Sequence, residues 1–246
     1  MTLTEAIEVR RSRRKYLADP VDPAAVEKLE ALAGEYSETA GSLPPVVAAA
    51  PRIEFVWNDG SAFDGLRKTY GLLAGVHSYA GLIGPKGDPV AEEKLGYYGE
   101  LLMLHAVTLE LGTCWVGGSF DRKLCPFELG EDEKLYCTIT VGPVRERDNL
   151  REKLIQGVTH RKTRTIEDMM TADGPVPDWF MDGMRAVQRA PSAVNKQPVV
   201  FSFKDGKVTA GVEGGDWIDL GIAKLHFELG VGQGTWAFGN HGAFTR

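Results

Sequence analysis

Two stretches of this chain resemble each other: LMLHAVTLELGTCWVGG at 102–118 and AKLHFELGVGQGTWAFG at 223–239. At an offset of 121 residues (223 − 102), the Leu-His pair at 104–105 aligns with that at 225–226, Trp115 with Trp236, and Gly118 with Gly239. Each stretch is typical of a helix that ends in a glycine-rich strand or loop. Similarity at a fixed offset indicates a repeated unit, so the sequence predicts two related halves.

A second match supports the repeat and predicts an insertion. The tripeptide PVV at 45–47 recurs at 198–200, an offset of 153 (198 − 45), which exceeds the first offset by 32 (153 − 121). The glycine-rich segment 61–90 has about this length, and we expect it to be the insertion and a lid over a site. We place the halves at 1–160 and 161–246, with a chance match of a few residues as the alternative.

Hydrophobic patterns predict an α+β fold. In the first half, Asp22 is placed to cap a helix whose first position is Pro23. Alternating and β-branched runs predict strands, and 203–208 carries an Asp-Gly pair suited to a hairpin turn. The expected helices span 3–11, 22–36, 89–111, 178–189 and 217–230, and the expected strands 51–57, 134–142, 199–203 and 208–212.

Composition excludes several classes of protein. Hydrophobic residues make up 43% and charged residues 25%, as in ordinary globular domains, and the net charge of −6 argues against nucleic acid as a partner. The longest weakly polar stretch, 71–84, is too short to span a bilayer, and the first residues lack the apolar core of a signal peptide. Three cysteines without metal-type spacing predict a reduced, cytoplasmic protein with no metal site.

Two basic clusters are candidates for anion binding. RRSRRKY at 10–16 closes the first helix, and HRKTR at 160–164 lies near the junction of the halves. Arginine forks and a hydroxyl suit a phosphate group. A solvated helix end and a solvated linker are the alternatives.

The remaining polar and glycine-rich segments also leave alternatives open. The glycines of GTCWVGG (112–118) either present backbone N–H groups to a flat cofactor or allow close packing. Cys114, with His105 or His226, is either a thiol nucleophile or a small buried residue beside two packing histidines. Glu100 and Asp219 lie on expected helices without any partner that the sequence identifies.

Together, four segments resemble the FMN-dependent nitroreductases. They are IEVRRSRRKYLADPVDPAAVEKLEALA (7–33), YYGELLMLHAVTLELGTCWVGGSFD (97–121), HRKTRTIEDMM (160–170) and RAPSAVNKQPVVF (189–201). The last segment is similar to a family motif that ordinarily lies soon after the first one, whereas here it follows about 180 residues later (190 − 10). EYSETAGSLPPVV (35–47) occupies the usual place and lacks the asparagine and glutamine.

The displaced motif implies a fused, two-half branch of the family. Ordinary members are dimers with flavin bound across the interface, and two halves of one chain can reproduce that arrangement as an intramolecular pseudo-dimer. The resemblance implies a small, mainly antiparallel sheet and a long central helix in each half. It also implies one competent site and an empty mirror site, in a monomer or a further homodimer.

The resemblance assigns the cofactor contacts residue by residue. Arg10, Ser12 and Arg14, with Arg11 less directly, would hold the FMN phosphate and ribityl chain, and Lys162 or Arg161 would add charge there. Gly117 and Gly118 would offer backbone N–H groups to the flavin. Pro191, Ser192, Asn195 and Gln197 would contact the ring system, although Val199 stands where the family has tryptophan.

The implied function is an FMN-dependent oxidoreductase. It would pass a hydride from NAD(P)H through flavin to a small nitroaromatic- or quinone-like acceptor, and this chemistry strictly requires no side-chain acid or nucleophile and no metal ligand. A flavin-binding sensor or storage protein without turnover is the alternative, and a Cys–His hydrolase a distant third.

Overall fold

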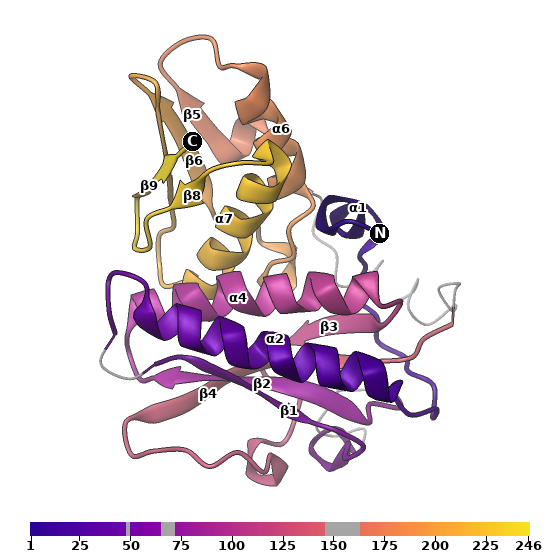
Figure 1. The fold of residues 1–246 in the computed structure, drawn as a ribbon. Helices are drawn as coiled ribbons and strands as arrows, with labels where there is room; N and C mark the ends of the chain where they lie inside the picture. Colours follow the sequence, from indigo (N-terminus) through magenta and orange to yellow (C-terminus); the bar gives the residue numbers. More distant parts are fainter. Residues whose placement is uncertain (48–49, 65–71, 146–162) are drawn as a thin grey trace.

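The computed structural model describes residues 1–47, 50–64, 72–145 and 163–246 (Figure 1). Two residues singled out in the sequence analysis, Arg161 and Lys162, lie outside these ranges. Within the described residues the fold is α+β, with two sheets and long helices, as predicted.

The first unit is a helix-covered antiparallel sheet. Its strands are β1 (Arg52–Val56), β2 (Ser78–Pro85), β3 (Gly112–Val116) and β4 (Glu133–Gly142), in the order β1-β2-β4-β3. Helices α2 (Pro23–Ser42) and α4 (Pro89–Thr108) lie together above it in Figure 1. Each helix begins with proline after an aspartate cap, Asp22 or Asp88, which accepts hydrogen bonds from the first free backbone N–H groups.

The second unit repeats this path with shorter elements. Helix α6 (Asp178–Gln188) precedes the hairpin β6 (Val200–Lys204) and β7 (Lys207–Gly211), and α7 (Trp217–Val231) precedes β8 (Thr235–Trp236) and β9 (Gly242–Thr245). The sheet order is β5-β6-β7-β9-β8, where β5 (Met170–Ala172) is an added parallel strand. Without β5, both units run helix, two strands, helix, two strands, with the same antiparallel pairing order.

The expectation of a lid over 61–90 is wrong for most of the described part of that segment. Ser78–Pro85 forms β2, which pairs with both β1 and β4 and is buried along its whole length. Its glycines and serine suggested a loop, but a strand buried on both faces needs no polar alternation. GTCWV, for which a strand or a loop was expected, is strand β3 at the edge of the sheet.

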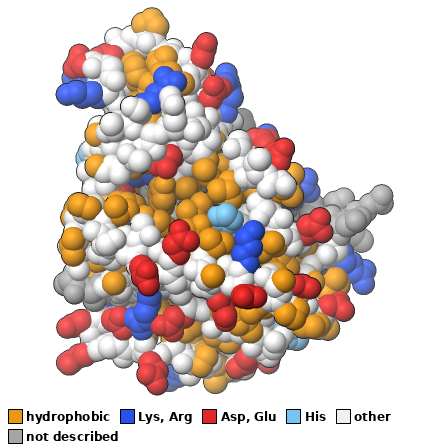
Figure 2. Space-filling view, in the orientation of Figure 1, with side chains coloured by type: hydrophobic (Ala, Val, Ile, Leu, Met, Phe, Trp, Pro, Cys, Tyr) orange, Lys and Arg blue, Asp and Glu red, His pale blue; other side chains and the backbone are white. Residues whose placement is uncertain are grey.

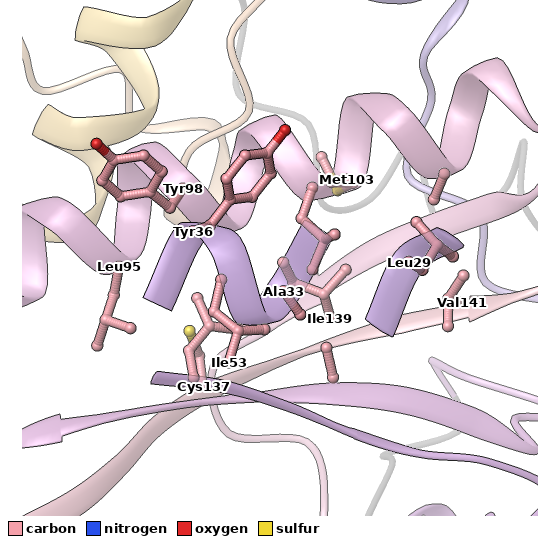
Figure 3. Close-up of a cluster of buried hydrophobic side chains, with 14 of the residues drawn as sticks. Leu29, Ala33, Tyr36, Ile53, Leu95, Tyr98, Met103, Cys137, Ile139 and Val141 are labelled. Atoms are coloured by element: carbon pink, nitrogen blue, oxygen red, sulfur yellow. The ribbon is translucent and has the colours of Figure 1, made fainter. Parts of the chain in front are cut away.

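Two hydrophobic cores stabilise the units. In the first, α2 and α4 pack onto the sheet, and Figure 3 shows Leu29, Ala33 and Tyr36 of α2 directed toward side chains of α4, β1 and β4. In the second, an aromatic cluster joins both helices to the sheet; it comprises Phe180, Phe201, Phe227, Trp236 and Phe244.

The units meet through α4 and α7, which approach each other closely. A Cβ added at Gly96 would lie 2.1 Å from the Ile218 carbonyl oxygen, and one at Gly221 would lie 1.9 Å from the Glu93 carbonyl oxygen. Only glycine allows this approach of two helix backbones. In Figure 2, hydrophobic side chains gather at mid-height, where α7 stands on α4 in Figure 1.

Helix α1 (Leu3–Val9) completes the joint between the units. It begins with a capping box in which Thr2 and Glu5 bond to each other's backbone N–H groups. Its Ala6 and Ile7 pack with Leu104 of α4, Ala186 of α6 and Leu225 of α7. Of the helices that the structure describes, none is long and apolar enough to cross a membrane.

Glu93, Lys94 and Lys224 are fully buried at the same joint. Lys224 of α7 forms an ion pair with Glu93 of α4 (Nζ–Oε1 2.5 Å) and donates to the carbonyl oxygens of Ala237 and Gly239. Glu93 also accepts from the Gly239 N–H at 2.6 Å. The adjacent Lys94 donates to the carbonyl oxygen of Ala40, near the end of α2, and to those of Leu43 and Pro45 in the loop that follows.

Candidate functional site

A cavity of about 920 Å³ lies between the two units. Its first wall comes from the segment after α1 and from the end of β3 with the following glycines; its second comes from the connector between α6 and β6 and from the first turns of α7. The cavity therefore joins segments that lie far apart in the sequence. One Arg10 Nη atom, for example, donates a hydrogen bond to the Arg189 carbonyl oxygen, 179 positions away, at 3.2 Å.

The basic segment after α1 is extended, which sorts its side chains into two sets. Ser12 pairs with Thr113 in a short parallel bridge, and the Arg13 N–H donates to the Thr113 carbonyl oxygen at 2.8 Å. Successive side chains of extended backbone point to opposite sides. Arg10, Ser12 and Arg14 therefore line the cavity, whereas Arg11 is exposed and does not line it.

A buried carboxylate lies beside Arg10. Glu100 of α4 is fully buried and accepts hydrogen bonds from the Trp115 indole and the His226 Nε2, each at 2.8 Å; the Arg10 Nε lies 3.8 Å from it. His226 faces the Ala186 carbonyl oxygen with its other nitrogen at 3.1 Å. The sequence identified no partner for Glu100 because His226, which binds it, is 126 positions away.

Gly117 and Gly118 face open space. A Cβ at either position would meet no heavy atom of the described residues within 4 Å, and both residues line the cavity. Close packing, one of the two interpretations of these glycines, therefore does not explain them. Their backbone is instead accessible to a ligand.

The connector between α6 and β6 is strained. Val194, Asn195 and Gln197 have φ angles of 49°, 52° and 46°, values that non-glycine residues rarely adopt, and Val194 is β-branched. Pro191, Ser192 and Asn195 line the cavity, and Val194 lines it while remaining 68% exposed. Strain of this kind is concentrated at functional sites.

Gln197 is placed differently from the other members of the motif. Its side chain is buried, accepts from the Arg164 N–H at 2.8 Å and donates to the Gln188 carbonyl oxygen at 3.0 Å. Its own N–H donates to Ser192 Oγ at 2.9 Å. Gln197 thus fixes the connector from behind and does not line the cavity. Val199 belongs to the second core.

Three acidic residues to which the sequence assigned no role also line the cavity: Glu92, Asp216 and Asp219. Asp219, in the first turn of α7, is 7% exposed, and burial raises its pKa to about 6. Glu92, on α4, has its pKa raised by burial as well. Helical position alone could not reveal Asp219 or Glu92, because the opposing wall comes from other segments of the chain.

None of the described histidines lines the cavity with Cys114. His226 is engaged by Glu100 and Ala186, and the half-buried His105 side chain packs against the Tyr36 ring. Cys137, also in the wall, has its thiol pKa raised to about 12 by burial. No cluster of metal-ligating side chains occurs in the described ranges of the chain.

Of the predicted site residues, the cavity brings together Arg10, Ser12, Arg14, Gly117, Gly118, Pro191, Ser192 and Asn195. Arg11 and Gln197 lie outside its lining, and Lys162 lies outside the described residues. Thr163, beside that position, does line the cavity.

Comparison with solved structures identifies the fold. The crystal structure of a putative nitroreductase from Thermotoga maritima matches with a TM-score of 0.66 and 19% identity, over 99% of this chain and 92% of that one. A nitroreductase with bound FMN from Bacteroides fragilis matches at a TM-score of 0.42 and 16% identity, over 61% and 92%. The second similarity is too low to support an argument about ligands. No curated protein matches the sequence.

A protein-family model gives the stronger result. The model described as "Putative TM nitroreductase" matches residues 2–231, which include every described residue of the cavity wall. Because the match covers most of the chain, the chain belongs to this nitroreductase family.

Proposed function

We propose that the chain is an FMN-dependent oxidoreductase that transfers a hydride from NAD(P)H to a nitroaromatic- or quinone-like acceptor. Membership of the nitroreductase family implies an oxidoreductase. The observation that carries the proposal is that two segments resembling flavin-binding motifs, about 180 positions apart, line one cavity.

The cavity fits such a cofactor in size and chemistry. Its volume of about 920 Å³ is at the upper end of ordinary ligand pockets, which span roughly 300–1,000 Å³. Arg10 and Arg14 supply guanidinium groups, and Ser12 supplies a hydroxyl, the donors that recognise a phosphate. The unobstructed backbone of Gly117 and Gly118 suits the edge of a flat ring.

The cofactor, when bound, supplies the hydride-transfer chemistry. The chain's own residues orient and enclose it: Arg10 and Arg14 hold the phosphate end, while the strained connector around Asn195 covers the ring. Glu100 keeps Arg10 and Trp115 in position. Lys162 or Arg161 would add positive charge near the phosphate.

We further propose that the two units form an intramolecular pseudo-dimer with one cofactor site. Their shared order of helices and strands supports an internal duplication with halves at 1–160 and 161–246. At the mirror position, the loops equivalent to the cavity walls follow α2 of the first unit and β8 of the second unit. Lys94 binds the carbonyl oxygens of the first loop, and Lys224 and Glu93 bind the backbone of the second. We infer that these buried charges close the mirror position to a second cofactor.

Counting flavins tests both proposals. We expect purified chain, saturated with FMN and desalted, to retain one FMN per chain and to bleach with NAD(P)H under anaerobic conditions. Two FMN per chain would contradict closure of the mirror site, and none would contradict FMN dependence. If the chain binds FMN but shows no turnover, either with NAD(P)H or in an acceptor assay driven by dithionite, the result would favour the flavin-binding sensor or storage protein.

The proposed setting is a reducing cytoplasm, with a small-molecule acceptor as partner and neither nucleic acid nor membrane involved. All three cysteines are free thiols, and the net charge is −6. The chain would act as a monomer or as a homodimer of pseudo-dimers. Sedimentation of the FMN-loaded chain distinguishes these two forms.

A further inference from the structure

Asp219 is a buried carboxyl group in the cavity wall without a basic partner. Both of its oxygens face the Ala193 N–H, at 3.3 and 3.2 Å, so one donor serves two acceptors. Among the described residues, no lysine, arginine or histidine nitrogen forms an ion pair with it. A buried carboxyl group so poorly satisfied is costly to ionise.

The charged and titratable groups around Asp219 come from four elements. On α7 itself, Asp216 pairs with Lys196 of the connector at 2.5 Å, so that each largely neutralises the other. Glu92 of α4, and Tyr136 and Cys137 of β4, also line the cavity. The charges that shift the pKa of Asp219 are therefore Asp216 and Lys196, which are paired with each other.

This environment favours the protonated carboxyl. Burial raises the pKa of Asp219 to about 6, with Asp216 adding to the rise and the Ala193 N–H and Lys196 opposing it. A substantial fraction of Asp219 thus carries a proton in weakly acidic solution. An acid poised near the working pH is suited to general acid catalysis.

The proposed reaction requires such a proton. A quinone that takes up a hydride must also take up one proton to become the hydroquinone. In the cavity wall, Asp219 lies beside Ala193. Ala193 belongs to the connector between α6 and β6, which we propose contacts the ring of the cofactor. None of the arginines at the phosphate end is an acid, because arginine does not lose its proton in proteins.

We propose that Asp219 is the general acid that protonates the acceptor; this rests on the proposed function. The acceptor oxygen takes the proton from the Asp219 carboxyl while the hydride, with its electron pair, comes from the reduced cofactor. The O–H bond of the carboxyl breaks, the O–H bond of the product forms, and water reprotonates the carboxylate.

The alternative role is structural. Asp219 fixes the Ala193 N–H at the start of the turn in which Val194 and Asn195 are strained. Two substitutions separate the roles. Asp219→Asn keeps an oxygen that accepts from Ala193 but cannot donate a proton as an acid, whereas Asp219→Ala removes both. Asp216→Asn is the matched control, because it changes the neighbouring acid and leaves Asp219 in place.

The experiment measures each half of the reaction on FMN-loaded protein by stopped flow. For Asp219→Asn we expect normal FMN affinity and normal reduction by NAD(P)H, but oxidation by a quinone slowed about 100-fold. The wild-type dependence of that step on a group titrating near neutral pH should disappear. Asp216→Asn should retain this dependence, with its midpoint at a lower pH, because Asp216 adds to the rise in the pKa of Asp219.

Three results decide the question. Wild-type chain that binds no FMN overturns the proposed function. An Asp219→Asn variant that binds FMN and passes electrons to the quinone as fast as wild type at every pH overturns only the role of Asp219. In the cofactor-free chain, ¹³C-carboxyl NMR should show a resonance titrating near neutral pH that Asp219→Asn removes; a resonance titrating in the ordinary aspartate range would also contradict the proposal.

Discussion

Arg10, Ser12 and Arg14 lie on one side of an extended segment, and this alternation gives a direct test of the phosphate site. We expect Arg14→Ala to weaken FMN binding about 10- to 100-fold, since a hydrogen bond to a charged group contributes roughly 1.5–3 kcal/mol. Fluorescence titration of the cofactor-free chain with FMN measures this affinity. Arg11→Ala, on the exposed side, should change the affinity little.

Riboflavin provides the second arm of this test. It lacks the phosphate, so its affinity should be the same for Arg14→Ala and for wild type. An equal loss of affinity for both ligands would show that Arg14 supports the fold of the cavity and not the phosphate.

Asp219 also makes stability depend on pH. Its pKa is raised to about 6 from the ordinary 3.8, so between these values the folded chain binds more protons than the unfolded chain. The contribution of Asp219 to the free energy of unfolding is therefore fully present at low pH and falls as pH rises through this window. At about 1.4 kcal/mol per pKa unit, the loss is roughly 2–3 kcal/mol.

Urea unfolding at about pH 4 and about pH 8 measures this effect. Asparagine does not titrate, so the stability of Asp219→Asn relative to wild type should rise by roughly 2–3 kcal/mol between the two pH values. A parallel pH dependence in both proteins would mean that Asp219 titrates normally in the folded chain.

At the scale of elements, the approach of α4 to α7 depends on two glycines. Alanine at Gly96 or Gly221 would place a methyl group about 2 Å from a carbonyl oxygen of the other helix, and the helices must then separate. We expect each substitution to lower the free energy of unfolding by about 3 kcal/mol or more. Loss of FMN binding should accompany it, since α7 carries part of the cavity wall.

Gly34 of α2 is the matched control. It is exposed, and a Cβ there would meet no heavy atom of the described residues within 4 Å. Gly34→Ala should therefore raise stability by roughly 0.5–1 kcal/mol, the ordinary gain for a helix interior. Chemical denaturation of the three variants compares them directly.

Some helices and strands could be predicted from the sequence, and others could not. Helices α2 and α4 carry their start signals locally, as an aspartate followed by proline, and both begin at the predicted residues. Strand β2 was missed because its burial on both faces depends on the segments packed against the sheet and not on its own pattern: Leu82 packs in the core with α2 and α4, whereas Tyr79 packs on the other side with Phe63. The basic segment after α1 could be identified, but its pairing with Thr113 could not.

At the scale of the whole molecule, the cavity and the joint between the units form one structure. Motif resemblance singled out several residues that line the cavity, since Arg10, Gly117 and Ser192 are recognisable in their own segments. The partners of Glu100 and Asp219 were not predictable, because His226 and Ala193 reach them only in the folded chain. Contacts between residues so far apart in the sequence leave no local sequence pattern by which they could be predicted.

This joint predicts cooperative unfolding. Hydrophobic contacts among α1, α4, α6 and α7, and the Glu93–Lys224 pair, connect the two units throughout. We expect near-ultraviolet circular dichroism, which reports tertiary packing, and far-ultraviolet circular dichroism to give coincident transitions. Separate transitions, or a segment 1–160 that folds alone with native spectra, would contradict this prediction.

The position of α1 has a consequence for biosynthesis. The cavity wall includes Ile7 and Ile222, which lie 215 positions apart in the chain (222 − 7). At about 5–20 residues per second, the first wall waits on the order of ten seconds until its counterpart is synthesised. A growing chain that has not yet reached Ile222 has only one wall, so cofactor capture must follow synthesis of the second wall.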